Sequence, residues 1–296
     1  MSAPEATGSR RTTTLARRHR IDRIMVGAMV VAVVVAIVPL GFILADVIVK
    51  GIGQLTGSFL TQPEPFAVTA SGGGFGAGIK GTIKMVGLGA VIAVPIGILA
   101  AVYLSEYDPR GPLATVVRFV ADVMTGIPSI FVGIFVFTAI VLTTHSFSSW
   151  AGGLALGILM LPVIVRTSEE ALRLVPGALR EAALALGVRR WRTIVSVILP
   201  TALPGITTGV LLAIARAAGE TAPLLLTAFG NQLLVGWGSW NGPEASLTLE
   251  IFTNSRSPFP TQQARAWTGA LVLIIGILIL SLLARAVVAR RSGRTR

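Results

Sequence analysis

Six long apolar stretches constrain the fold of this chain more than any other feature. They cover residues 25–49, 82–104, 122–143, 150–165, 204–229 and 267–288. An α-helix rises about 1.5 Å per residue, so about 20 apolar residues cross a hydrocarbon core of about 30 Å. The sequence therefore predicts an all-α, polytopic membrane protein with six transmembrane helices.

The composition supports a membrane protein and excludes several kinds of site. Hydrophobic residues make up 53% of the chain and charged residues only 13%, about half the charged fraction of a soluble domain. No cysteine is present, which excludes disulfides, thiolate metal sites and cysteine nucleophiles. Because the only histidines are His19 and His145, no metal centre is expected.

Basic residues gather on one side of the six stretches. The net charge is +12, and eighteen basic residues fall in the first 23 residues, between the fourth and fifth stretches, in the tail and at Arg110. Only Lys50, Lys80, Arg256 and Arg265 lie on the other side. Since cytoplasmic loops carry the excess of Lys and Arg, both termini are expected to be cytoplasmic. The charge thus indicates orientation rather than nucleic-acid binding.

Three segments follow from this pattern. Residues 1–23 form an Arg-rich arm that we expect to be disordered or to lie on the inner leaflet. Residues 24–290 form the six-span domain, which includes a cytoplasmic loop over 166–200, and residues 291–296 form a basic tail. A chain with uncleaved apolar spans and these basic loops belongs in a membrane, so the lipid bilayer is its first partner.

The third apolar stretch contains a break. The run Gly126-Ile-Pro-Ser-Ile130 interrupts it, and Pro128 removes a backbone hydrogen bond and clashes with the preceding turn. Pro128 and Ser129 therefore mark a predicted helix break, which should lie inside the protein because lipid offers no hydrogen bonds. Pro95, Pro162 and Pro223 predict further kinks.

Small residues and a glycine-rich run indicate packing rather than nucleotide chemistry. Gly153 and Gly157, like Gly205 and Gly209, have the spacing that lets membrane helices approach closely. The run over residues 72–82 lacks the Gly-Lys-Ser/Thr succession of a phosphate-binding loop. No cofactor is therefore expected on this chain, and a partner must hydrolyse any ATP that drives it.

The basic loop over residues 166–200 has the pattern of a docking element. The polar run over 167–170 is typical of a helix start, and Pro176-Gly177 should end that helix. A second helix is expected over 178–186, with Gly187 as its left-handed cap. Ala182 and Ala183 would form a shallow surface for another protein, to which Glu181 offers a carboxylate.

This loop carries a resemblance to a known family. Glu181-Ala182-Ala183, Gly187 and Leu199-Pro200 are similar to the pattern EAA-x3-G-x9-I-x-L-P of ABC importer permeases, with Val197 at the usual Ile. The runs Gly126–Ile130, Arg166–Glu170 and Ala215–Leu225, the last with Gly-Glu-Thr-Ala-Pro, resemble phosphate importer permeases of the PstA type. The resemblance covers about residues 70–290.

The fifth stretch suggests an anion pathway on physical grounds. Arg216 falls near its middle, and Glu220 follows one turn later on the same helix face. A charged residue there must line a polar interior or find a partner, and arginine suits phosphate because its planar fork holds two oxygens. We expect Arg216, Glu220 and Thr221 to face the substrate; a purely structural ion pair is the alternative.

Three further charges are open to interpretation. Arg118 and Asp122 repeat the four-residue spacing at the start of the third stretch, and Arg118 is expected to snorkel to the cytoplasmic surface. Arg166, just beyond the fourth stretch, is either a cytoplasmic anchor or an inner contact for the departing anion.

The resemblance implies a complete transport system around this chain. It implies a type I ABC importer permease without enzymatic activity of its own, in a bacterial plasma membrane. Its implied partners are a homologous permease, two cytoplasmic ATPases that bind ATP and Mg²⁺, and an extracytoplasmic phosphate-binding protein. A permease for sulfate, molybdate or phosphonate and a stand-alone anion channel or carrier remain alternatives.

Overall fold

The computed structural model describes residues 9–70, 72–231 and 237–292, with side chains from residue 21 to residue 286. It divides into two units, residues 1–50 and residues 51–296, which we describe separately. Helices and a few isolated bridges account for the regular structure in the described ranges, and no strand occurs there. The prediction of an all-α chain is confirmed.

The first unit is one long helix. Helix α1 (Ser9–Gly51) contains the first predicted span, and its segment from Ile21 is long and apolar enough to cross a membrane. The helix begins at Ser9, within the arm that was expected to be disordered or to lie on the inner leaflet. Extending an existing helix costs far less free energy than nucleating a new one, so the helix of the apolar span can continue into the polar residues before it. Residues 1–8 of the predicted arm lie outside the described residues.

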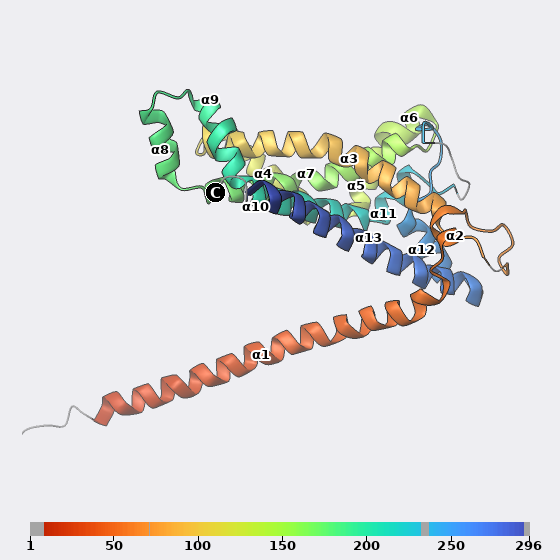
Figure 1. The fold of residues 1–296 in the computed structure, drawn as a ribbon, viewed down its shortest axis with the longest axis horizontal. Helices are drawn as coiled ribbons and strands as arrows, with labels where there is room; N and C mark the ends of the chain where they lie inside the picture. Colours follow the sequence, from red (N-terminus) through yellow and green to blue (C-terminus); the bar gives the residue numbers. More distant parts are fainter. Residues whose placement is uncertain (1–8, 71, 232–236, 293–296) are drawn as a thin grey trace, which may run out of the picture. The chain divides into compact units, whose positions relative to one another are not determined.

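Long helices form the centre of the second unit. They are α3 (Gly76–Val102), α7 (Ser149–Arg173), α10 (Leu199–Ala218) and α13 (Pro260–Ser292), and Figure 1 shows them running alongside one another. Met85 of α3, Leu156 and Met160 of α7 and Ala213 of α10 meet in one buried core cluster. Helix α13 contains the sixth span, and residues 293–296 of the predicted basic tail lie outside the described residues.

Glycines set the contact between α3 and α7, as their spacing predicted. A Cβ atom on Gly89 would lie 2.9 Å from both the Gly153 oxygen and the Gly157 nitrogen. Gly205 likewise faces Ala171, and Gly209 faces Thr167, across the contact between α10 and α7. These positions need glycine because any side chain would push two helix backbones apart.

The third span is broken as expected. Helix α4 (Pro112–Gly126) and helix α5 (Ser129–Val136, continued to Thr144 through the π-helix Phe137–Val141 and α6, Leu142–Thr144) meet at an angle of 104°. Pro128 immediately precedes α5. With this pair counted as one span, the described chain has six candidate spans, in agreement with the sequence.

The fifth span differs from the predicted continuous helix. Helix α10 ends at Ala218, and α11 (Ala222–Thr227) starts after a gap of three residues, Gly219 to Thr221. Glycine lowers helix stability, and Pro223 fits the first turn of a new helix but not the interior of an old one. Pro223 therefore starts α11 rather than kinking a longer helix. Gly133 of α5 lies against Pro223, so the two broken spans pack together.

Short elements occupy opposite ends of the second unit. Helix α8 (Gly177–Ala185) and helix α9 (Arg190–Thr193), followed by the π-helix Ile194–Ile198, lie at one end (Figure 1). Helix α12 (Leu247–Ser255) and the short segments Ile52–Gln54 and α2 (Gly57–Thr61) lie at the other. The two groups belong to the two sides that the charge pattern distinguishes, with α8 and α9 on the basic side.

The predicted helix start at residues 167–170 is wrong. Helix α7 runs unbroken from Ser149 to Arg173, through the polar run. The reason is that Glu169 is buried and forms ion pairs with arginines. It is therefore stable in the middle of a continuous helix and does not mark a first turn. The predicted break at Pro176-Gly177 is confirmed, since α8 begins there.

Candidate functional site

Arg216 lies at the helix break of the fifth span. It occupies the last turn of α10, where a positive charge is favourable beside the unpaired carbonyl groups. Its Nε atom lies 3.9 Å from Oε1 of Glu220, a loose contact. The Arg216 side chain is 51% exposed in this single chain, whereas that of Glu220 is 17% exposed. The pair predicted from the four-residue spacing therefore forms, although the helix ends between its members.

Helix α12 contacts the break of the fifth span. Thr221 precedes α11 without capping it through its side chain, and it is partly exposed. The Thr248 hydroxyl of α12 donates to the Glu220 carbonyl oxygen over 2.9 Å. Helix α12 thus holds the break from one side, while the Arg216 guanidinium remains open on the other.

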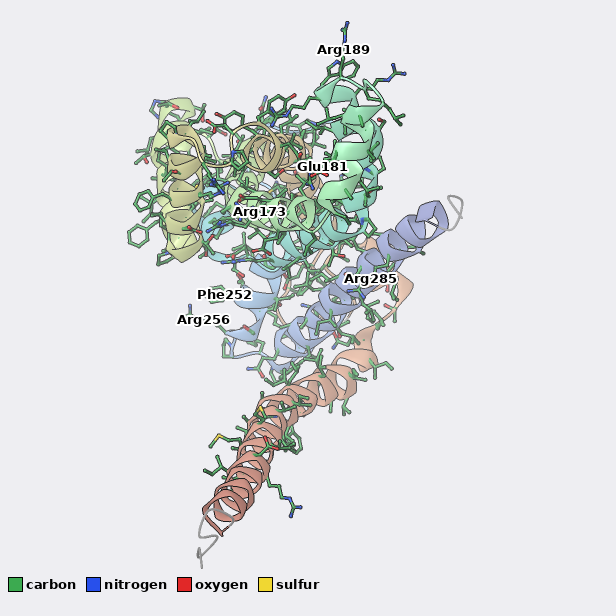
Figure 2. The ribbon with its side chains drawn as sticks, turned by 90° about the vertical axis from the view of Figure 1, so that its left-hand side faces the viewer. Arg173, Glu181, Arg189, Phe252, Arg256 and Arg285 are labelled. Atoms are coloured by element: carbon green, nitrogen blue, oxygen red, sulfur yellow. The ribbon has the colours of Figure 1, made fainter. Side chains whose placement is uncertain are left out.

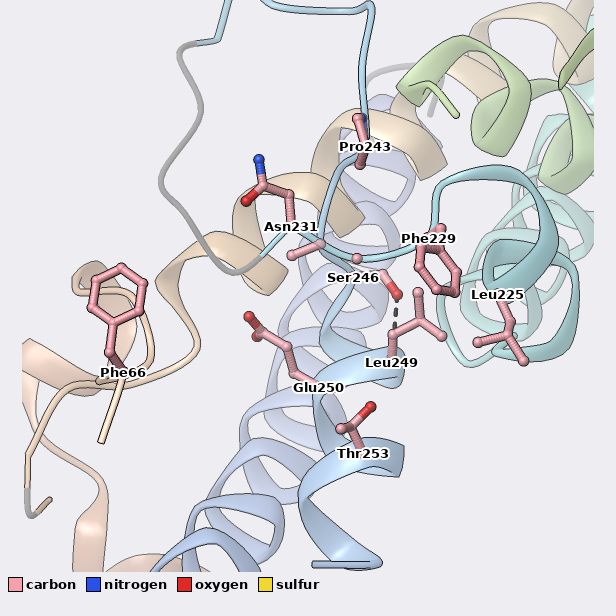
Figure 3. Close-up of a pocket in the computed structure, with 11 residues that line it drawn as sticks. Phe66, Leu225, Phe229, Asn231, Pro243, Ser246, Leu249, Glu250 and Thr253 are labelled. Atoms are coloured by element: carbon pink, nitrogen blue, oxygen red, sulfur yellow. Dashed lines mark hydrogen bonds between the residues drawn. The ribbon is translucent and has the colours of Figure 1, made fainter. Parts of the chain in front are cut away.

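A cavity of about 620 Å³ lies beyond the break, on the side of α12. Leu225 and Phe229 at the end of α11 line it, together with Phe66, Asn231 and Glu250. Figure 3 shows the Glu250 carboxyl group directed toward the space between Phe66 and Asn231. The cavity therefore shares α11 with the helix break.

Glu250 has an unusual environment. Burial, followed by the nearby charge of Glu64, raises its pKa to about 8. Gly78 belongs to the first turn of α3, and a Cβ atom there would collide with Glu250. Glu250 therefore lies against the N-terminus of α3, which has no side-chain cap of its own.

Two buried ion pairs at this end were missed by sequence reasoning. Nζ of Lys84 lies 2.5 Å from Oε2 of Glu244, with side chains 1% and 3% exposed, and the Ser149 hydroxyl donates to the same oxygen. Arg265 pairs with Glu64 at 3.6 Å, both nearly fully buried. A lysine inside an apolar span was the available indication, but nothing in the sequence connects it with a glutamate 160 residues away.

Arg118 and Asp122 do not pair with each other. The Arg118 guanidinium donates to Oε1 of Glu169, to the Pro109 oxygen and to the Leu104 oxygen, each over 2.8 Å. A buried carboxylate and two backbone carbonyls, one of them in the exposed loop at Pro109, satisfy the guanidinium. That Arg118 snorkels to the cytoplasmic surface stays a prediction.

Arg166 contacts carboxylates rather than standing alone. It forms an ion pair with Asp122 of α4, and its Nη1 lies 3.8 Å from Oε2 of Glu169. Arg173 also pairs with Glu169, at 2.6 Å. These groups form a charge network between α4 and α7. Asp122 and Arg166 are 54% and 37% exposed although both lie in candidate spans, so lipid is an unsuitable neighbour for them.

The predicted docking helix is present. Helix α8 ends in a motif in which the Val188 amide donates to the Ala183 oxygen and the Gly187 amide donates to the Leu184 oxygen. Gly187 has φ of +75°, the left-handed conformation expected for such a cap. Glu181 and Ala182 are exposed, and Figure 2 shows Glu181 on α8 and Arg189 at the tip of the segment that follows.

One part of the docking prediction needs correction. Ala183 is the one buried residue of α8, with an exposed fraction of 8%. It faces its own chain, so it cannot form a surface together with Ala182. Leu179, Leu184 and Leu186 are exposed instead. Apolar side chains gathered on a solvent-facing helix are typical of a protein interface.

Comparisons with known proteins agree with this arrangement. The sequence matches the family described as "Binding-protein-dependent transport system inner membrane component" over residues 93–293. The phosphate transport system permease protein PstA of Yersinia pestis is 43% identical over 251 residues, covering 84% of each chain. That of Haemophilus influenzae is 41% identical over 270 residues, covering 90% of this chain and 94% of the relative.

A solved structure shares the fold. A chain of the inward-facing MetNI methionine ABC transporter aligns with a TM-score of 0.60 and 20% identity, covering 73% of this chain and 95% of that one. At this identity the likeness concerns the fold alone. It supports the expected type I importer permease architecture.

Proposed function

Because the chain belongs to the binding-protein-dependent transport system inner membrane components, and within them to the PstA-type permeases, we propose that it carries inorganic phosphate through the membrane. It acts as the permease subunit of an ATP-driven importer in a bacterial plasma membrane. The chain is a transport component rather than an enzyme, and a separate ATPase binds and hydrolyses ATP.

The exposed guanidinium of Arg216 at a helix break carries this proposal. Its side chain is half exposed, and its contact with Glu220 is loose. In a membrane such a group needs water, a partner protein or an anion beside it. Its planar fork can hold two phosphate oxygens and keeps its charge at every physiological pH. Arg216 therefore contacts phosphate in transit, and Glu220 orients it and balances its charge between passages.

The neighbouring residues shape the route. The Thr221 hydroxyl, which caps no helix, offers a hydrogen bond to the anion. The cavity lined by Leu225 and Glu250 receives phosphate from the extracytoplasmic side. Arg166, already paired with Asp122, lies on the cytoplasmic side, where it positions α7 against α4 more than it binds the anion. The Pro128–Ser129 break lets α5 move separately from α4.

Other subunits complete the transporter. Exposed charges at Asp122 and Arg216 within candidate spans call for a second, homologous permease that encloses the route. The exposed surface of α8 around Glu181 and Ala182 docks a cytoplasmic ATPase, one of two in the assembly, and an extracytoplasmic phosphate-binding protein delivers the substrate. When the ATPases close, α8 moves, and the broken spans expose the route to each side in turn.

Uptake by reconstituted complexes tests the proposal. Arg216→Gln removes the charge and the planar guanidinium fork but leaves a polar side chain, and we expect phosphate import to fall at least about tenfold at normal assembly. Arg256→Gln, a change in an exposed loop arginine, is the matched control and should import normally. Excess sulfate and molybdate should leave phosphate uptake unchanged. Normal import by Arg216→Gln would remove Arg216 from the route.

A further inference from the structure

The inner end of α3 is held by an unusually complete set of arginine contacts. Helix α3 continues into a π-helical turn, Tyr103–Tyr107, in which Glu106 is buried with a side-chain exposure of 6%. Single π-helical turns cost stability and are frequent at functional positions. Glu106 lies within the chain's own interior and takes no part in the anion route described above.

Arg180 of α8 joins this turn to two other elements. Its Nη2 lies 2.7 Å from Oε1 of Glu106, and its Nε lies 3.1 Å from Oε2. The same guanidinium donates to the Leu172 oxygen over 2.8 Å and to the Val175 oxygen over 2.6 Å, at the end of α7. One side chain thus connects the docking helix to α3 and to α7.

Arg190 of α9 adds a second connection on the other side of α8. Its Nη2 donates to the backbone oxygens of Glu106 and Tyr107, and its Cζ lies 5.3 Å from the centre of the Tyr107 ring. The segments before and after the docking surface therefore contact the same turn of α3.

Apolar packing alone does not hold α8 in place. Only Ala183 among its nine residues is buried, and burying one methyl group contributes about 1 kcal/mol. Arg180 donates to two carboxylate and two carbonyl oxygens. Bidentate, charge-assisted pairs of this kind fix the relative orientation of the two side chains in addition to stabilising their contact. Because buried ion pairs often add little net stability, this one is better explained by the orientation it imposes.

We propose that the Glu106–Arg180 pair transmits the movement of α8 to α3 and α7, so that ATPase closure opens and closes the anion route. The inference rests on the proposed function. Glu106 and Arg180 are positioning residues. They do not contact phosphate, and the ATPase docks on the exposed face around Glu181 and Ala182 rather than on this pair. Without the pair, α8 would move on its own, and ATP would be hydrolysed without transport.

The first experiment measures phosphate imported per ATP hydrolysed by the complete complex in proteoliposomes. We expect Glu106→Gln to retain the ATPase subunits and to hydrolyse ATP, while the import ratio falls at least about tenfold. Arg110→Gln is the matched control, because Arg110 is exposed nearby and forms no ion pair within the described part of the chain. An unchanged ratio in Glu106→Gln, or loss of its ATPase subunits, would overturn the proposal.

The second experiment restores the connection covalently. The chain contains no cysteine, so Glu106→Cys/Arg180→Cys can be joined by a short bifunctional thiol reagent. We expect the untreated double variant to be uncoupled and the cross-linked variant to regain import. Import that stays low after cross-linking, or is normal before it, contradicts transmission through this pair. Wild-type complexes that import no phosphate would instead refute the proposed function, and this inference with it.

Discussion

Lys84→Met is expected to destabilise the chain strongly by isolating a buried carboxylate. Nζ of Lys84 lies 2.5 Å from Oε2 of Glu244, and both side chains are almost fully buried. At an effective dielectric constant of 20, unit charges this close attract by about 7 kcal/mol. Part of that attraction offsets the cost of desolvating both ions. Removing one partner leaves Glu244 charged with the Ser149 hydroxyl as its remaining donor, at an expected cost of about 3–5 kcal/mol.

The double variant separates this mechanism from loss of packing. Lys84→Met/Glu244→Leu leaves no charge in the site, so it should lie within about 2 kcal/mol of wild type. The singles Lys84→Met and Glu244→Leu should each lose several kcal/mol, because each leaves one buried charge without its partner. Their effects must therefore be strongly non-additive, as expected for groups in direct contact.

Tryptophan fluorescence provides the assay. Trp240 lies over Lys84, with its ring centre 5.0 Å from Nζ, and it packs against Trp150. Unfolding of the purified chain in detergent micelles by added dodecyl sulfate gives the free energy for each variant. Additive losses in the double variant, or wild-type stability of Lys84→Met, would refute the argument from buried charge.

Three further predictions concern single positions. Gly89→Ala should lower the free energy of unfolding by about 1–3 kcal/mol, because the new Cβ atom would clash with the α7 backbone. Gly87→Ala is the control, since its Cβ atom would have no atom within 4 Å. Equal stabilities of the two variants would contradict the glycine contact. Gly187→Ala should weaken ATPase binding measurably, since φ of +75° costs alanine about 1–2 kcal/mol, and Gly177→Ala is the control. The pKa of Glu250 is raised from a usual 4.5 to about 8, so the folded state binds more protons than the unfolded state between these pH values. Stability should therefore fall as the pH rises from about 4.5 to about 8. If the melting temperature of Glu250→Gln changed with pH as steeply as that of wild type, this prediction would be disproved.

Much of the fold followed from local patterns in the sequence. Apolar runs of sufficient length predicted the six spans, and Pro128 predicted the sharp break between α4 and α5. Gly187 predicted the end of α8 because few other residues adopt its conformation. In each case a few neighbouring residues decide the backbone conformation.

Contacts between distant segments were not predictable in the same way. Glu169 resembles an N-terminal helix residue until its arginine partners, Arg118 of α4 and Arg173, are placed beside it. The break after Ala218 was also missed, since Gly219 and Pro223 are tolerated in many membrane helices. Here packing against α5 and α12 adds to their local effect and favours two helices. At Arg216 the spacing predicted the ion pair but not its looseness or its exposure.

Cysteine labelling at position 216 tests most directly whether this side chain faces an anion route. Since the chain has no cysteine, Arg216→Cys gives this subunit a single thiol, whose labelling is read from this subunit after the complex is separated. A water-soluble, membrane-impermeant thiol reagent should label it, and phosphate delivered by the binding protein should slow the labelling during ATP turnover. Labelling only by reagents dissolved in the lipid, with no effect of phosphate, would contradict a route past Arg216.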